Sequence, residues 1–139
     1  MPTPTSSAAT TDGIRIAATA FYLQEESDSH HDQYVFGYRI QITNEGNVPA
    51  TLTHRHWIII DGEGRREEVH GPGVVGQTPT LAPGQSFKYT SYCPLTTPWG
   101  TMEGAYDMQR PDGTRFPAAI NRFYLAIPAP TPTTHAQQA

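Results

Sequence analysis

In Phe36-Gly37-Tyr38-Arg39-Ile40-Gln41-Ile42-Thr43, apolar side chains alternate with polar residues or glycine. In an extended chain this alternation puts the apolar side chains on one face and the other residues on the opposite face. The stretch therefore predicts a β-strand that buries one face in a core and exposes the other to solvent.

Shorter alternating stretches recur at residues 14–20, 87–89, 102–108 and 123–127. The breaks between strands, such as Asn44-Glu45-Gly46-Asn47 and Pro111-Asp112-Gly113, consist of residues that tolerate or pre-set turn dihedral angles. No window has a helical period, so the pattern predicts an all-β fold, an antiparallel β-sandwich of about seven strands. The expected core includes Phe36, Tyr38, Ile40, Trp57, Tyr89 and Met102.

Length and composition limit the classes of protein that this chain can represent. A length of 139 residues predicts one domain. The net charge of −4, with one lysine and scattered arginines, argues against a nucleic-acid partner. No apolar run approaches a membrane span, and the single cysteine, Cys93, fits a reducing compartment. We therefore expect a cytoplasmic protein with no membrane partner.

The two ends of the chain differ in composition from the middle. Residues 1–12 and 129–139 are rich in Pro, Thr, Ser, Ala and Gln and offer little apolar surface to bury. Such segments cannot offset the entropy of ordering, so both are expected to be flexible tails. The folded domain is predicted to span residues 13–128.

The glycine segment at residues 71–76 has the spacing G-x-G-x-x-G. In a dinucleotide-binding fold this motif opens a helix, but the prolines and turn residues at 77–84 exclude a helix here. Backbone N–H groups of Gly71, Gly73 and Gly76 can still cradle a phosphate without a helix. The candidate anion-binding loop adds Arg65, Arg66 and His70 as sources of positive charge. Pro72 removes one donor, so a purely structural role for the glycines is favoured.

Three histidines form a weak candidate for a divalent-metal site. His54 and His56 share one face of a strand, and His70 offers a third imidazole nitrogen. The spacing arises easily by chance, and no carboxylate accompanies the pair in sequence. Ordinary polar histidines are therefore favoured, and no cofactor is expected.

The strand expected at residues 51–61 has apolar residues of both parities. Leu52, Ile58 and Ile60 share one face, whereas Trp57 and Ile59 share the other. Either a bulge reconciles the two sets, or Ile58 and Ile60 form an outer apolar patch beside His56. Trp57 is expected in the core. Trp99 follows a turn and is interpreted either as a buried cap or as an exposed interface anchor.

Several motifs together resemble the ApaG family. They are Tyr34–Tyr38, Arg55-His56-Trp57, the glycine segment, Leu81-Ala82-Pro83-Gly84 and Pro98–Gly104. The resemblance extends from about Gly13 to Pro128 and implies a fibronectin type III-like sandwich in a small bacterial cytosolic protein. It also implies a family that is linked genetically to cobalt resistance and magnesium efflux, without an established reaction.

These observations favour a protein-interaction module without catalytic activity. Its candidate partner surface is His56, Ile58, Ile60 and Trp99, and it would bind another protein or a second copy of itself. Binding of a phosphate or nucleotide at the glycine segment is the first alternative. Binding of a divalent metal by the histidines is the second.

Overall fold

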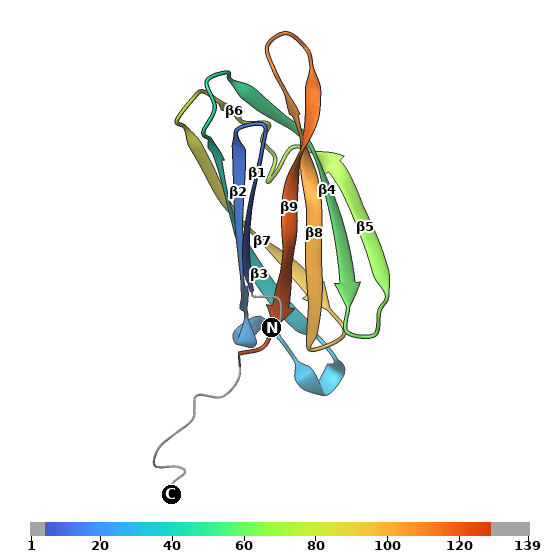
Figure 1. Cartoon of the computed structure of the whole chain (residues 1–139). Coiled ribbons are helices and arrows are strands. Elements are labelled where there is room, and N and C mark those ends of the chain that lie inside the picture. The colour runs from blue at the N-terminus through green and yellow to red at the C-terminus, as the bar shows by residue number, and fades with distance from the viewer. Residues whose placement is uncertain (1–4, 129–139) are drawn as a thin grey trace, which may run out of the picture.

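The computed structural model describes residues 5–128 and consists of antiparallel strands in two layers (Figure 1). Residues 1–4 and the predicted tail at 129–139 lie outside the described part. The strands are β1 (Ser6–Thr11), β2 (Ile14–Tyr22), β3 (Tyr34–Asn44), β4 (Ala50–Asp61), β5 (Arg66–Pro72), β6 (Thr80–Leu81), β7 (Ser86–Leu95), β8 (Trp99–Gln109) and β9 (Arg115–Ala126). Two short 3-10 helices, η1 (Gln24–Glu26) and η2 (Ser29–His31), connect β2 to β3.

One sheet has the strand order β1-β2-β3-β7, and the other has the order β5-β4-β8-β9 with β6 also paired to β4. Leaving out β1 and the two-residue β6 leaves seven strands in a three-plus-four sandwich. The predicted antiparallel sandwich is therefore confirmed. None of the described helices is long and apolar enough to cross a membrane.

The core lies between the two sheets and is built from the alternating faces that the sequence predicts. All six expected core residues are at most 9% exposed. Trp57 packs edge-on against Tyr38, Tyr106 and Phe123, with ring centroids 5.3–6.2 Å apart. The buried residues form a single cluster that spans both sheets.

The N-terminal tail predicted through Asp12 is wrong for Ser6–Thr11, which form β1. This strand pairs with β2 over six residues and turns through Asp12 and Gly13, both of which have positive φ. An Asp-Gly pair favours such a tight hairpin turn. Ser7 Oγ donates to the carbonyl of Asn121 in β9, so side-chain and backbone hydrogen bonds, rather than apolar burial, hold β1 in place.

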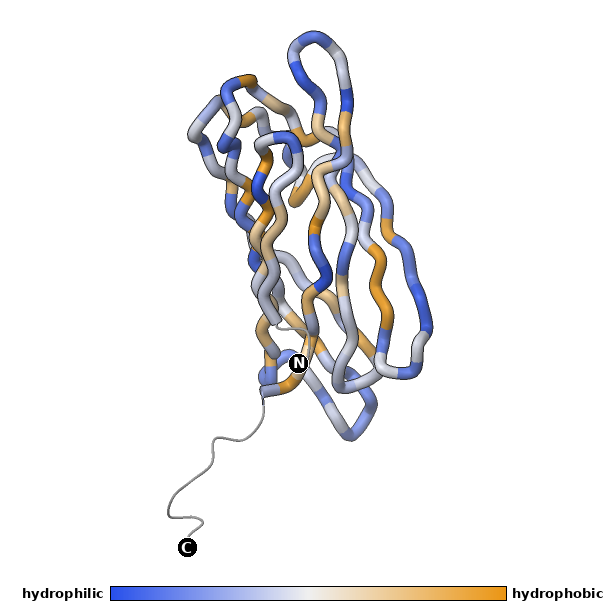
Figure 2. Tube along the Cα trace, in the orientation of Figure 1, coloured by the Kyte–Doolittle hydropathy of each residue, from blue (hydrophilic) through white to orange (hydrophobic). Residues whose placement is uncertain are grey.

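A β-bulge in β4 resolves the conflict between its two apolar sets. The pairing of β4 with β8 shifts register between Leu52 and His54, which lets Leu52 and Trp57 both face the core. Ile59 packs against the core from the same side as Trp57. Ile58 and Ile60 consequently face outward, and Figure 2 shows this part of β4 as an orange stretch beside the largely blue β5.

Candidate functional site

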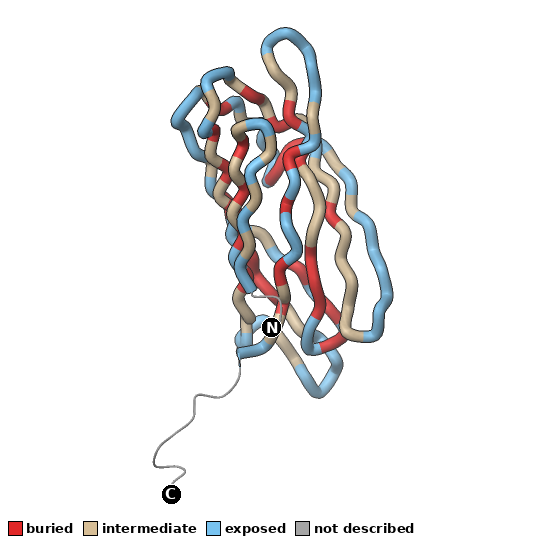
Figure 3. Tube along the Cα trace, viewed as in Figure 1, coloured by how far each residue is buried: buried red, intermediate tan, exposed pale blue. Residues whose placement is uncertain are grey.

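The outer face of the β5-β4-β8-β9 sheet carries most of the residues that the sequence singles out. His56, Ile58 and Ile60 project from β4 between β5 and β8. Ile58 lies between Glu68 and Glu103, and Ile60 lies between Arg66 and Thr101. Both isoleucines are only partly buried, because no second layer covers this side in the described chain (Figure 3).

Trp99 lies at the end of the same face, at the first position of β8. Its side chain is 45% exposed, so the interpretation as a buried cap is wrong. The indole stacks against the Tyr124 ring, with centroids 5.9 Å apart, and lies over Gly62, where an added Cβ would come within 2.6 Å of Nε1. The packing of these neighbours holds the exposed ring in place.

Ion pairs surround this apolar strip on two sides. Arg66 Nη2 lies 3.0 Å from a Glu68 carboxylate oxygen in β5, and Arg122 Nε lies 2.5 Å from a Glu103 carboxylate oxygen across β8 and β9. Each pair is largely solvent-exposed and contributes little to stability. The outer face therefore combines an apolar strip with a charge-balanced border.

The structure brings two of the three candidate metal ligands together and adds a carboxylate. His56 and His70 are direct cross-strand neighbours, and their rings stack with centroids 4.1 Å apart. Glu68 Oε1 lies 2.9 Å from His56 Nε2 and 3.7 Å from His70 Nε2. His54 is outside this group, and its Nδ1 contacts Thr53 Oγ1 at 3.1 Å.

The hydrogen bond from His56 and the nearby Arg66 guanidinium lower the pKa of Glu68 below its ordinary value. The carboxylate is therefore ionised at neutral pH. Glu68 is not among the ligands predicted from the sequence, although it is two residues from His70 and therefore on the same face of β5. What could not be read from the sequence is the register that places β5 beside His56.

Three backbone donors of the glycine loop are used within the fold. Gly73 N–H donates to the Thr53 carbonyl, and Val74 and Gln77 exchange two hydrogen bonds around a turn at Val75 and Gly76. Gly73 has φ +60°, and an added Cβ would come within 2.3 Å of the Gln77 carbonyl oxygen. The Val74 side chain is buried in the core, whereas Val75 is 52% exposed. The loop geometry supports the structural role of the glycines.

Of the residues proposed to supply positive charge to this loop, His70 directly precedes Gly71, whereas Arg65 and Arg66 lie at the other end of β5. Arg65 is in the turn at the opposite end of β5, where it pairs with Asp61 and Glu63. At a strand rise of about 3.3 Å per residue, it lies roughly 20 Å or more from Gly73. The guanidinium that reaches the loop is that of Arg55, which donates to the carbonyls of Pro72 and Gly73. This guanidinium packs over Gly71, where an added Cβ would come within 2.7 Å of Nη2 and displace it.

Replacing Val75 with asparagine is expected to stabilise the protein by roughly 1 kcal/mol. Val75 has φ +42°, a left-handed conformation that costs a β-branched residue about 1–2 kcal/mol. Val75 and Gly76 both have positive φ, and Asn-Gly is the preferred pair for such a turn. Because the Val75 side chain is exposed, replacing it sacrifices little buried apolar surface. Urea unfolding of Val75→Asn against the wild type measures the gain. Val75→Ala is the control and should gain less stability than Val75→Asn. If Val75→Asn were less stable than the wild type, the backbone at Val75 would not be strained.

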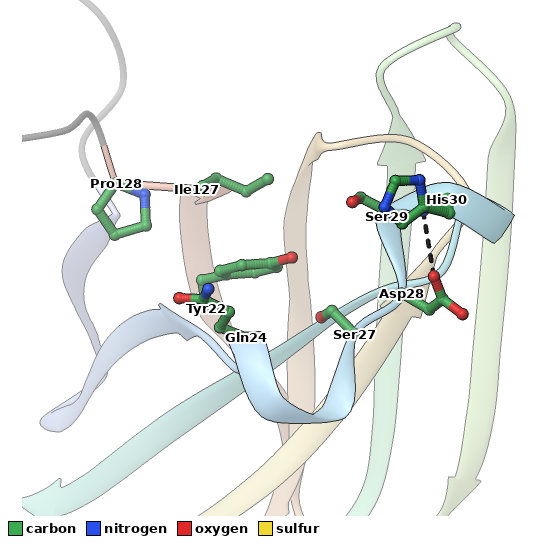
Figure 4. A pocket seen from close by; sticks show the side chains of 8 residues that line it. All are labelled: Tyr22, Gln24, Ser27, Asp28, Ser29, His30, Ile127 and Pro128. Carbon is green, nitrogen blue, oxygen red and sulfur yellow. Dashed lines mark hydrogen bonds between the residues drawn. The ribbon is translucent and has the colours of Figure 1, made fainter.

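Another hollow in the described chain lies at the end of β2 and has a volume of about 590 Å³ (Figure 4). None of its lining residues is a site residue predicted from the sequence; they are Tyr22, Gln24, Ser27, Asp28, Ser29, His30, Ile127 and Pro128. Asp28 Oδ1 accepts from the backbone N–H of His30, and Oδ2 contacts His31 Nδ1 at 2.7 Å. Both oxygens are engaged in holding η2, so the acid has a structural role.

The chain resembles known proteins both in sequence and in structure. The family model of the ApaG domain matches residues 24–110 of this chain. The chain is 50% identical over 120 residues to Protein ApaG of Methylobacterium sp. (strain 4-46), covering 86% of this chain and 92% of the relative. It is 52% identical over 115 residues to Protein ApaG of Azoarcus sp. (strain BH72), covering 83% and 91%.

A crystal structure of the putative ApaA protein from Bordetella pertussis superposes with a TM-score of 0.80 at 47% identity, covering 91% of this chain and 98% of that one. The C-terminal domain of wzt superposes with a TM-score of 0.53 at 8% identity, which shows a shared fold alone. The fold and comparisons define a small antiparallel β-sandwich domain of the fibronectin type III kind. The chain belongs to the ApaG family, as the sequence motifs predicted.

Proposed function

We propose that this protein is a cytoplasmic protein-interaction module without catalytic activity. Its contact surface is the outer patch, which we define as Ile58, Ile60, Trp99 and Tyr124. The patch lies on the outer face of the β5-β4-β8-β9 sheet and contains the outward residues of β4 together with the exposed aromatic residue of β8.

The observation that carries this proposal is the exposure of Trp99 next to the two outward isoleucines. A soluble domain rarely leaves tryptophan 45% exposed on a flat sheet, and tryptophan is the residue type most enriched among interface hot spots. Tyr124 and Gly62 hold the ring in one orientation, so little side-chain entropy remains to be lost on binding.

The border of the patch indicates the chemistry of the partner. Arg66 with Glu68 and Arg122 with Glu103 place both signs of charge around it. An apolar centre within a mixed polar rim is typical of protein–protein interfaces and does not favour a polyanion. The partner is therefore a folded protein surface with an apolar centre, or a second copy of this chain.

The partner contacts the face of β4 rather than its edge. β4 pairs with β5 on one side and β8 on the other, so its backbone groups are already engaged. This excludes strand addition to β4 itself. The alternative of nucleotide binding at residues 71–76 is less favoured, because the Gly73, Val74 and Gln77 N–H groups have partners within the fold.

Trp99→Ala and Ile58→Lys are expected to weaken the association by roughly tenfold or more each, about 1.4 kcal/mol. Sedimentation velocity over a range of concentrations measures self-association. A photoreactive phenylalanine analogue at position 99, introduced in living cells, captures an external partner by cross-linking.

Two variants on the outer face of the other sheet serve as matched controls. Tyr92 is an exposed aromatic residue of β7, and Ala17 lies on the inner strand β2. Tyr92→Ala and Ala17→Lys should leave association unchanged. A wild type that is monomeric at every concentration, with no more cross-linking at position 99 than at position 92, would refute the proposal.

A further inference from the structure

We infer that His56, Glu68 and His70 form a binding site for one borderline transition-metal ion of the Zn²⁺ class. The site lies at the border of the outer patch and is independent of the proposed protein interaction. Two imidazoles and one carboxylate form a ligand set that suits zinc and its neighbours, whereas magnesium and calcium prefer oxygen alone.

The spacing of the ligand atoms fits a single ion. The three atoms lie within 4.8 Å of one another, and Glu68 Oε1 is 2.9 Å and 3.7 Å from the two Nε2 atoms. In a tetrahedral zinc site with bonds near 2.0–2.1 Å, neighbouring ligand atoms are roughly 3.3 Å apart. The observed distances bracket this value, so small side-chain rotations are sufficient.

The backbone beneath the ligands is rigid. His56 and His70 are paired directly across β4 and β5, and Glu68 is two residues from His70 on the same face. The rings are nearly parallel, at 13°, so one ring must turn before both lone pairs meet at an ion. That rotation about χ2 is soft, and the His70 side chain is 66% exposed.

A second observation supports a ligand role for Glu68. Arg66 Nη2 holds Oε2 at 3.0 Å, which leaves Oε1 directed at the two imidazoles. An outer contact that orients a ligating carboxylate in this way is typical of metal sites. Next to the cluster lies a cavity of about 350 Å³, lined in part by His54, Gly71 and Asp107. It leaves room for water or a partner side chain at the fourth coordination position.

The test is calorimetric titration of the full chain with ZnCl₂, with MgCl₂ as the comparison. We expect a saturable one-to-one isotherm for zinc and none for magnesium. His56→Ala, His70→Ala and Glu68→Gln should each weaken zinc binding by roughly tenfold or more. All three side chains lie at the surface, and metal-free thermal unfolding verifies that each variant is folded.

His54→Ala is the matched control, because it removes an imidazole two residues away on the same strand. It should change the affinity by less than about twofold, as should His31→Ala near η2. Long-range ¹H–¹⁵N spectra of the imidazoles supply a second readout, in which Nε2 of His56 and His70 shifts on zinc addition and the His54 ring does not. No zinc isotherm, equal loss in the His54 variant, or full affinity in a His56→Ala/His70→Ala double variant would each overturn the site.

Discussion

Replacing Trp57 with alanine is expected to lower the free energy of unfolding by about 3–5 kcal/mol. The side chain is 2% exposed and is surrounded by the rings of Tyr38, Tyr106 and Phe123, so its loss leaves a large cavity between the sheets. Its Nε1 has no hydrogen-bond acceptor among the described residues, so the loss comes from packing alone. Urea unfolding measures the change.

The other tryptophan of the chain is the control for this experiment. Trp99 is 45% exposed on the outer face, and Trp99→Ala is expected to cost less than about 1 kcal/mol. If the two variants lost equal stability, Trp57 would not be the centre of the core. The comparison also verifies that Trp99→Ala remains folded in the association experiments.

Raising the pH from 9 to 11 is expected to lower the free energy of unfolding by roughly 5 kcal/mol. Burial raises the pKa of the Cys93 thiol from 9.0 to about 12. Burial also raises the pKa of the Tyr89 and Tyr106 phenols well above their ordinary value of 10.0. Each group remains protonated in the folded chain at a pH where the unfolded chain has released the proton.

The unfolded state therefore binds fewer protons in this window, and stability falls as the pH rises. Each pH unit costs about 1.4 kcal/mol per group, beginning near pH 9 for the thiol and near pH 10 for the two phenols. Unfolding in urea at successive pH values measures the slope. Stability that stays constant to pH 11 would show that these groups ionise as readily in the folded protein as in the unfolded chain.

Tyr89→Phe/Tyr106→Phe is the control variant for the pH experiment. The two hydroxyls hydrogen-bond to each other, so removing both leaves neither partner unsatisfied. Above pH 10 the double variant should lose stability less steeply, by about 2.7 kcal/mol per pH unit. Its remaining slope then reports mainly on Cys93 and Tyr38, whose pKa is also raised by burial.

The sequence was sufficient to predict the sandwich and its centre, because alternation over residues 36–43 and the turn residues are local signals. A bulge in β4 was one of the two arrangements predicted from the sequence, but its position between Leu52 and His54 was not predicted. A bulge depends on pairing with β8, which no single strand encodes. β1 was missed because its small side chains bury little, although the Asp12-Gly13 turn signal was present.

The candidate site was predicted only in part. His56 and His70 are 14 positions apart in sequence, and only the register of β4 with β5 makes them neighbours. The same register separates Arg65 from the glycine loop and places Arg55 there instead. Motifs read along one strand predicted which side chains share a face, and the pairing between strands determined which of them meet.

The strand β5 is an outermost strand of its sheet, and its free side exposes backbone groups that another chain could pair with. It begins with Arg66, Glu67 and Glu68, which are all exposed, and Figure 3 shows most of the strand in pale blue. Charged side chains on such an edge strand oppose its pairing with a second copy, since pairing would desolvate them. The charged segment that precedes the glycine motif thus disfavours open strand pairing, and aggregation, at this edge of the sheet.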